Sequence, residues 1–181
     1  YDYTTLQRTG NATVAGAPRL LPTNAGQARS RGVEVDGELR VGAGGRLSYG
    51  VTLLDARYVS YMATAATSWA GHKLDRAPSH VYTLGYQHRL PLAGGQLTGG
   101  VFARASGEYT ISVPSQLLVY RVPSYTSTDA TLSWQPDGAR WSVLARVRNI
   151  EDKVRPLIVE SFGMTTPSAP RTADLRLVVR F

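Results

Sequence analysis

The side chains that could carry out chemistry are few and widely spaced. His72, His80 and His88 follow one another at intervals of eight residues. His72 falls in a loop-like stretch and His88 near the opposite rim of a strand-like one, so we expect no metal site. Ser, His and Asp occur without any arrangement that indicates a hydrolytic triad. Gly94-Gly95 and Gly99-Gly100 lack the Lys-Ser or Lys-Thr that completes a phosphate loop. We expect neither enzyme activity nor a cofactor.

Composition excludes several other classes of protein. The 181 residues suffice for one domain, and a hydrophobic content of 43% argues against disorder. Cys is absent, which removes disulfide frameworks and thiolate metal sites. The net charge is +7, but the arginines are scattered singly, so we expect no nucleic-acid partner. No run approaches the roughly 18 apolar residues of a membrane helix. Without a signal peptide at Tyr1, the sequence predicts a mature chain or a fragment.

The last eight residues show most clearly how the chain is built. Side chains alternate between the two faces of a strand. One face would carry Leu175, Leu177, Val179 and Phe181, and the other Asp174, Arg176 and Arg180, with only Val178 out of pattern. Terminal residues usually fray, so a strand this regular is predicted to be tied into a sheet.

Similar strand-like stretches recur along the chain, at 1–8, 28–41, 46–61, 80–90, 96–113, 124–135 and 141–149. Short turns at 42–45, 91–95 and 136–140 alternate with long connections at 9–27, 62–77, 114–123 and 151–170. This alternation puts all short turns on one side, which is typical of membrane β-barrels. We therefore predict an all-β fold, an antiparallel transmembrane β-barrel of about eight up-and-down strands. Trp134, Trp141 and Phe181 would lie near one rim, as an aromatic girdle does.

Five short motifs occur in a fixed order over most of the chain. They are N-x-G-x-A-x-S-x-G-V-E-x-D at 24–36, L-D-A-R-Y at 54–58, G-x-x-L-x-x-A-P-x-H at 71–80, V-x-N-I-x-D-K at 147–153, and P-R-T at 170–172 with the terminal Phe181. Each motif alone is weak. Together they resemble the C-terminal end of TonB-dependent outer-membrane receptors of the siderophore-receptor type.

The resemblance implies a much larger barrel, of about 22 strands, than this chain can supply. Residues 1–181 would be the C-terminal part of that barrel, an open fragment without the plug domain. Members of the family import ferric siderophores, haem, cobalamin or sugars by active transport. The chain is therefore expected to be part of an importer of ferric siderophores or similar large nutrients in the bacterial outer membrane. The implied partners are outer-membrane lipid, the barrel-assembly machinery, the ligand, and the TonB energy-coupling complex, which would bind through the missing N-terminal region.

The charged residues of the strands are predicted to face the lumen, because polar lumen residues are the rule in large barrels. We expect them to hydrate the lumen and contact the plug rather than the substrate. The set is Glu34, Asp36, Glu38, Arg40, Arg146, Arg148, Asp174, Arg176 and Arg180. Asn149 and Asp152, at the upper end of a strand, are predicted to anchor a loop.

Aromatic residues near the outer strand ends are the better candidates for ligand contact, because rings pack against flat chelators and stack with cations. An outer-leaflet aromatic belt explains the same positions equally well. The residues are Tyr58, Tyr61, Trp69, Tyr109 and Tyr120. By the same resemblance, Leu175, Leu177, Val179 and Phe181 would form the signal that the assembly machinery recognises.

Two other functions remain open on pattern alone. Eight strands can close into a complete small membrane barrel with a structural or adhesive role. The same alternation also builds a soluble ligand-binding barrel, whose apolar face points inward. The receptor motifs favour the transport fragment over both.

Overall fold

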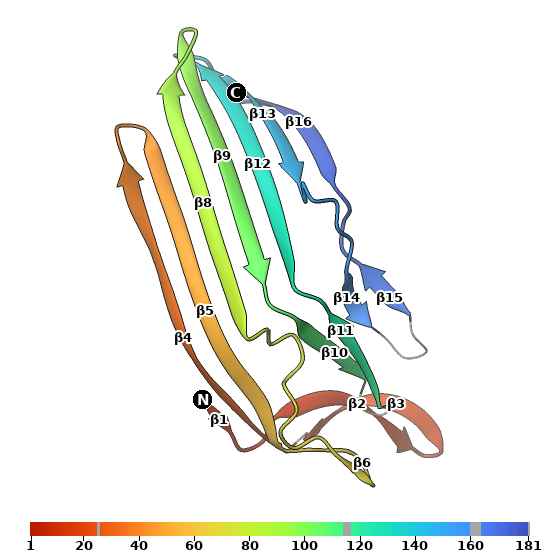
Figure 1. Ribbon diagram of the computed structural model, residues 1–181. Helices are drawn as coiled ribbons and strands as arrows, with labels where there is room; N and C mark the ends of the chain where they lie inside the picture. Colours follow the sequence, from red (N-terminus) through yellow and green to blue (C-terminus); the bar gives the residue numbers. More distant parts are fainter. Residues whose placement is uncertain (25, 114–116, 160–163, 181) are drawn as a thin grey trace.

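The structure, a computed structural model, describes residues 1–24, 26–113, 117–159 and 164–180 (Figure 1). These residues include no helix able to cross a membrane. An eight-stranded antiparallel sheet has the order β1-β4-β5-β8-β9-β12-β13-β16, and four two-stranded sheets accompany it. The strands are β1 (Asp2–Tyr3), β2 (Gln7–Val14), β3 (Ala17–Asn24), β4 (Gln27–Val41), β5 (Gly45–Ser60), β6 (Met62–Thr64), β7 (Thr67–Ser68), β8 (His80–Pro91), β9 (Gly95–Ser106), β10 (Tyr109–Val113), β11 (Leu118–Val122), β12 (Tyr125–Pro136), β13 (Trp141–Arg148), β14 (Pro156–Val159), β15 (Thr165–Pro167) and β16 (Thr172–Val179).

All short connections of the sheet lie at one end, at the top of Figure 1. They join β4 to β5, β8 to β9 and β12 to β13. At Ala93 and Gly94 the backbone takes φ angles of 52° and 66°, the two positive values of a type I′ hairpin turn. We call this the turn end and the opposite end the loop end. The prediction of an antiparallel, up-and-down sheet with its short turns on one side is confirmed.

The register gives the sheet one apolar face. Residues directly opposite each other on paired strands share a face. Val35 of β4 lies opposite Val51 of β5, which lies opposite Tyr82 of β8. The same face continues through Val101 on β9 and further strands to Leu175 and Leu177 on β16, which are 76% and 65% exposed. This side of the sheet therefore needs a cover.

The other face carries the charges, and we call it the charged face. One row crosses seven strands from β4 to β16, and its members are Arg40, Arg46, Gln87, Gly100, Thr131, Arg146 and Asp174. Glycines leave this face hollow. A Cβ added at Gly85 would come within 2.4 Å of the Ser48 hydroxyl. A shallow cavity of about 230 Å³ lies there, lined by Gly85, Gln87 and Asp129 among others.

The first connection was predicted incorrectly as a loop over 9–27. It is a hairpin, with β2 paired to β3 along its length. Only Asp2–Tyr3 of the predicted strand at 1–8 joins the main sheet. The turn has positive φ at both Ala15 and Gly16, 50° and 81°. Because Ala15 occupies a position where Asn or Asp is usual, the sequence lacks the dipeptide typical of a type I′ turn.

One predicted strand and two predicted loops also differ from the structure, because their backbone forms local hairpins. The predicted strand at 96–113 is broken at Gly107, where the N–H donates to the His80 carbonyl (2.9 Å), and β10 leaves the sheet to pair with β11. The connections at 62–77 and 151–170 contain the short hairpins β6–β7 and β14–β15. Exposed connections still need partners for their backbone N–H and C=O groups, and a local hairpin supplies them.

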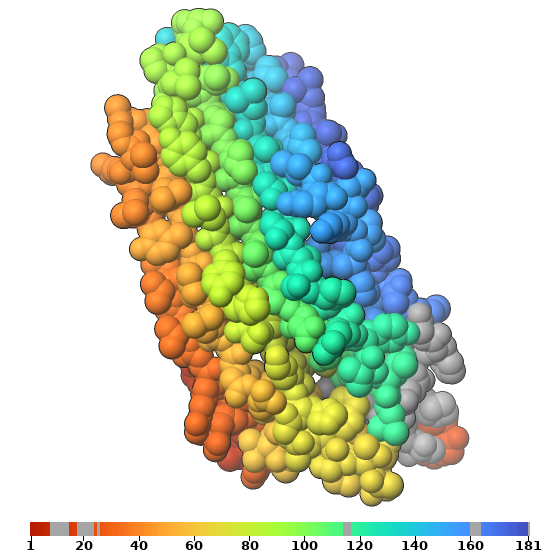
Figure 2. Space-filling model, in the orientation of Figure 1, coloured from red at the N-terminus to blue at the C-terminus, as the bar shows by residue number. Residues whose placement is uncertain are grey.

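The sheet is open. β1 and β16 stand at its two opposite edges, and β16 pairs only with β13 among the described residues. Figure 2 shows the long strands side by side in chain order, with β4 on one side and β16 on the other. The described core is small, a cluster of Ile111, Val122 and Val159. No packed interior of a soluble barrel forms in this part of the chain.

Candidate functional site

The loop end carries the candidate site, and β5 begins it. Leu53 and Asp55 of β5 lie on the apolar face, because they pair with Val33 and Arg31. Side chains alternate along a strand, so Ala56 and Tyr58 lie on the charged face. Both side chains are buried, with Tyr58 only 3% exposed. Long connections therefore fold over the charged face at this end, and leave the apolar face uncovered.

The segment at 69–76 is the first of these connections, and its backbone extends the sheet beside β5. It runs beside β5, where the Tyr58 N–H donates to the His72 carbonyl and the Leu74 N–H to the Ala56 carbonyl, each at 2.9 Å. The Arg76 N–H then donates to the Thr110 carbonyl of β10, also at 2.9 Å. These bonds extend the pairing of β5 onto the β10–β11 hairpin.

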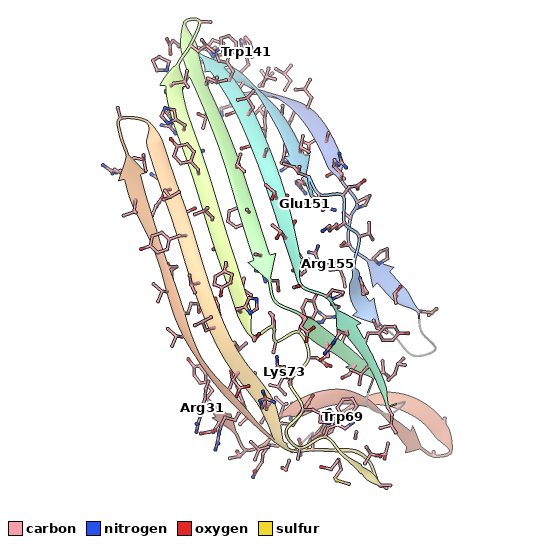
Figure 3. The ribbon with its side chains drawn as sticks, viewed as in Figure 1. Arg31, Trp69, Lys73, Trp141, Glu151 and Arg155 are labelled. Carbon is pink, nitrogen blue, oxygen red and sulfur yellow. The ribbon has the colours of Figure 1, made fainter. Side chains whose placement is uncertain are left out.

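Three of the five predicted ligand-contact aromatics meet where this segment joins β5. The Tyr58 and Tyr61 rings lie 4.8 Å apart between centroids, and Tyr61 contacts Trp69 edge-on at 6.0 Å. The His72 ring, which was not among the predicted residues, stacks on Trp69 at 5.6 Å. Trp69 is 6% exposed, so these rings mainly hold the segment in place (Figure 3).

Tyr109 and Tyr120 belong to a second group. Both pack against the cluster of Ile111, Val122 and Val159, which joins β10–β11 to β14. Tyr109 also lines a cavity of about 410 Å³. Its other lining residues are Arg76, Pro78, Arg104, Ser106, Tyr125, Leu157 and Ile158. This cavity brings together rings and guanidinium groups from widely separated parts of the sequence, and only Tyr109 was predicted for it.

β14 covers the charged face on the other side of this cavity. The Arg76 side chain donates to the Leu157 carbonyl at 2.8 Å, and the Arg155 guanidinium lies 3.9 Å from the centre of the Tyr125 ring. Such a contact is a cation–π interaction. Arg155 is labelled in Figure 3 between β13 and β14. No sequence motif indicated this pairing, since the two residues are joined only by the fold.

The turn after β13 anchors the last connection, as predicted for Asn149 and Asp152. The Asn149 side chain donates to the carbonyls of Lys153 and Ala169, at 3.2 and 3.0 Å. Asp152 accepts the Arg171 N–H at 2.8 Å. Both residues have positive φ, 52° and 55°, which Asn and Asp tolerate better than most residues. The predicted loop-anchoring role is confirmed.

Glu151 makes the remaining contact of this turn. Its carboxylate accepts both the N–H and the hydroxyl of Thr128 on β12, at 2.8 and 2.6 Å. The hydroxyl hydrogen bond holds the pKa of Glu151 below its usual value. The sequence offered no signal for this contact, because a single Thr in a strand and a single Glu in a loop are common.

Eight of the nine predicted lumen charges share the charged face. Glu34, Asp36, Glu38 and Arg40 alternate along β4, while Arg146, Arg148, Asp174 and Arg176 share one face of β13 and β16, and Arg180 follows β16. Arg146 donates two hydrogen bonds to Asp174, at 3.0 and 3.2 Å, and Arg46 pairs with Glu38 at 2.9 Å. The described residues hold no group of His, Asp or Glu able to bind a metal ion.

The predicted assembly signal lies on the opposite face. Leu175, Leu177 and Val179 of β16 follow one another along the apolar face. Phe181, its last residue, lies outside the described residues. At the turn end of the same face, Trp134 and Trp141 pack edge-on at 5.6 Å, and the Trp134 indole N–H donates to the Leu92 carbonyl at 3.0 Å. These two rings make the part of the expected aromatic rim that lies within the described residues.

Comparison with solved structures finds the same fold in iron-uptake receptors. The ferric yersiniabactin uptake receptor FyuA from Yersinia pestis matches with a TM-score of 0.74 at 19% identity, over 89% of this chain and 25% of that one. The ferric preacinetobactin receptor BauA from Acinetobacter baumannii matches with a TM-score of 0.69 at 21% identity, over 97% and 25%. The ferric-catecholate import receptor Fiu from E. coli matches with a TM-score of 0.68 at 18% identity, over 99% and 24%.

The chain thus spans about a quarter of the length of these structures. No curated protein matches it. A family model described as "TonB dependent receptor-like, beta-barrel" matches residues 1–150, which is most of the chain. Together with the open antiparallel sheet, this match assigns the chain to the β-barrel family of TonB-dependent receptors.

Proposed function

We propose that residues 1–181 form the C-terminal part of the barrel wall of a receptor that imports ferric siderophores or similar large nutrients by TonB-dependent active transport. As a member of this family, the chain is a piece of a bacterial outer-membrane protein. In this orientation the apolar face meets lipid and the charged face lines the lumen. The names of the solved relatives, each a ferric siderophore receptor, support the choice of ligand class.

One structural observation carries the proposal: the loop-end segments fold over the charged face. Tyr58 is buried there against the Tyr61 ring, which contacts Trp69, and β14 lines a cavity together with Arg104 and Tyr125. A pore wall whose long loops turn inward narrows its own entrance. That arrangement suits a gated importer of a bulky ligand better than an open diffusion pore.

The cavity between Arg104, Tyr109 and Tyr125 is the part of this entrance best suited to a ferric chelate. Guanidinium groups bind anionic oxygens, and phenol rings pack against flat aromatic chelators. Tyr58, Tyr61, Trp69 and Tyr120 would support the loops around this cavity. The remaining strands, the plug and the contact with the TonB complex would come from sequence outside this chain.

The test uses the complete receptor in cells that lack their other iron receptors. Uptake of radioactive iron is measured with a panel of ferric catecholate, hydroxamate and mixed-ligand chelates. Arg104→Gln and Tyr109→Ala should each weaken binding of the transported chelate, by up to about tenfold for loss of one ring contact. Arg89→Gln, on the charged face near the turn end, is the matched control. Failure to take up any of the chelates would contradict the proposal.

The complete small barrel is not favoured by any observation. It requires β1 and β16 to pair, and they stand at opposite edges of the sheet.

A further inference from the structure

The apolar face carries charges only at the loop end. Among the described residues of the eight-stranded sheet, its Asp, Glu, Lys and Arg side chains occur on β1, β4 and β5 and nowhere else on that face. They are Asp2, Arg29, Arg31, Asp55 and Arg57. Arg29 and Arg31 lie on the same face as Val33 and Val41, because no bulge interrupts the pairing of β4 with β5 between Arg29 and Val41.

These charges lie at a defined depth relative to the apolar band. On β4 the uncharged outward positions run from Val41 to Val33, and Arg31 is the next outward residue. That stretch is about nine residues, and a spanning strand needs about 9–11. Trp141 stands at the other limit of the band, at the turn end (Figure 3). The charges therefore begin where the hydrocarbon ends, on the side of the long loops.

Three cations form a continuous row across this boundary. Arg29 lies directly opposite Arg57 on β5, and Arg57 lies opposite Lys73 of the segment at 69–76. Like charges placed directly opposite each other on neighbouring strands destabilise a sheet. Such a row is therefore favourable only where anions lie against it.

The protein supplies part of the counter-charge. Asp2 pairs with Arg29 at 2.7 Å, and Asp55 pairs with Arg57 at 2.6 Å. Both arginine side chains remain 48% exposed. Arg31 and Lys73 make no ion pair with any residue in the described ranges. Two cations at this boundary are thus left without an ion-pair partner among the residues that the structure describes.

A concave surface adjoins the row. Arg57 and Lys73 line a cavity of about 290 Å³ together with Thr110, Ser112 and Arg121 of the β10–β11 hairpin. Its carboxylates already have partners, because Glu108 pairs with Arg121 at 3.2 Å and Asp75 accepts the Ser112 hydroxyl at 2.8 Å. The Arg57 guanidinium and the Lys73 ammonium group in this hollow suit a phosphate oxygen.

We propose that Arg29, Arg31, Arg57 and Lys73, the outward basic cluster, bind the phosphate groups of anionic lipid headgroups in the outer leaflet. This inference rests on the proposed function only for the direction in which the apolar face points. Basic residues next to a membrane surface attract anionic headgroups, and the planar guanidinium binds phosphate with two parallel hydrogen bonds. The cluster shares the apolar face, opposite the face on which the proposed chelate cavity lies.

The experiment compares lipid retention by the complete receptor in nanodiscs, read by native mass spectrometry. Phosphatidylglycerol is the anionic probe and phosphatidylcholine the zwitterionic one. Wild-type receptor should retain phosphatidylglycerol preferentially, and raised ionic strength should weaken that retention because salt screens exposed charges. The double variant Arg31→Gln/Lys73→Gln should retain at least about fivefold less phosphatidylglycerol.

Two controls make the result specific. Arg40→Gln/Arg89→Gln removes the same charge from the other face and should leave lipid retention unchanged. Arg31→Lys/Lys73→Arg keeps the charge and should bind as the wild type does. Ferric chelate uptake should be unaffected in Arg31→Gln/Lys73→Gln. A failure of the lipid-binding inference is therefore distinguishable from a failure of the import proposal. Equal retention of both lipids by the wild type, or displacement by inorganic phosphate at equimolar lipid, would overturn the inference.

Discussion

Glu151 and Thr128 are joined by two hydrogen bonds that tie the turn after β13 back onto β12. The carboxylate of Glu151 accepts from the backbone N–H of Thr128 at 2.8 Å and from its hydroxyl at 2.6 Å. One residue earlier, the Ile150 N–H donates to the Thr128 carbonyl at 2.9 Å. Thr128 is therefore the point on β12 to which the last long connection is fixed.

Glu151→Ala should destabilise this connection by about 1–3 kcal/mol, because the Thr128 N–H loses its acceptor in a half-buried place. Hydrogen exchange at the Thr128 amide in the complete receptor measures the effect. Glu108→Ala is a suitable control, since its ion pair with Arg121 is exposed and such pairs are worth about 0–1 kcal/mol. Equal exchange at Thr128 in both variants would contradict the anchoring role.

The same contact predicts a pH dependence with a definite sign. The pKa of Glu151 is lower in the folded chain than its ordinary value of 4.5, mainly because the Thr128 hydroxyl donates to the carboxylate. Its stabilisation is therefore fully present above that value and is lost as pH falls through the lower folded pKa. Amide protection at Thr128 should decrease on acidification below about pH 4.5 in wild type, and should be insensitive to pH in Glu151→Gln. Protection that rises on acidification would contradict the assignment.

The two faces of β16 predict opposite responses to substitution. Leu175→Arg places a charge on the apolar face, which costs roughly 2–4 kcal/mol near the middle of a bilayer. Val143→Arg on the neighbouring strand should behave alike, since Val143 lies opposite Leu177 on the same face. Arg176→Gln changes the charged face and should cost far less. Urea unfolding in lipid vesicles measures all three, and equal costs on the two faces would show that they are assigned wrongly.

We propose that Leu175, Leu177 and Val179 of β16, with the terminal Phe181, direct assembly. Leu175, Leu177 and Val179 lie in line on the apolar face of an edge strand. An edge strand can pair by β-augmentation with a strand of the barrel-assembly machinery. Removal of Phe181 from the complete receptor should slow assembly in cells and expose unfolded protein to periplasmic proteases. Spontaneous refolding in detergent should be nearly unchanged, because only one ring is lost. Normal assembly in cells would exclude the signal role, and equal failure in both settings would leave a structural one.

Alternation and connection length predicted the sheet because both depend on local geometry. Val33, Val35 and Leu39 lie on the same face of β4, because side chains alternate along any strand. Their spacing therefore predicts a sheet with one apolar and one polar face. The hairpins within the connections were missed, since Ala15-Gly16 is a weak turn signal and the partner strands β2 and β3 lack the alternation of the wall.

The candidate site was predictable only in part. Tyr109 was predicted because it is aromatic and lies near a strand end, and it does line the cavity at the loop end. Arg76, Arg104 and Tyr125 join it through long-range pairing that no local pattern encodes. The outward basic cluster was also hidden, because Arg29 and Arg31 belong to a motif read as a strand entry. Only the register shows that they share a face with Arg57.

The central claim is that this chain is an open section of a larger wall, and one distance tests it directly. In the complete receptor, spin labels at Tyr3→Cys and Thr172→Cys mark the loop ends of β1 and β16, the two edge strands. Seven spacings of about 4.8 Å separate these edges across the sheet, and the register offsets the two sites by about ten residues, roughly 33 Å, along the strands, so a curved open section predicts a distance of about 35–45 Å. Pulsed electron paramagnetic resonance measures distances in this range. A distance below about 10 Å, the value for adjacent strands of a closed eight-stranded barrel, would contradict the account.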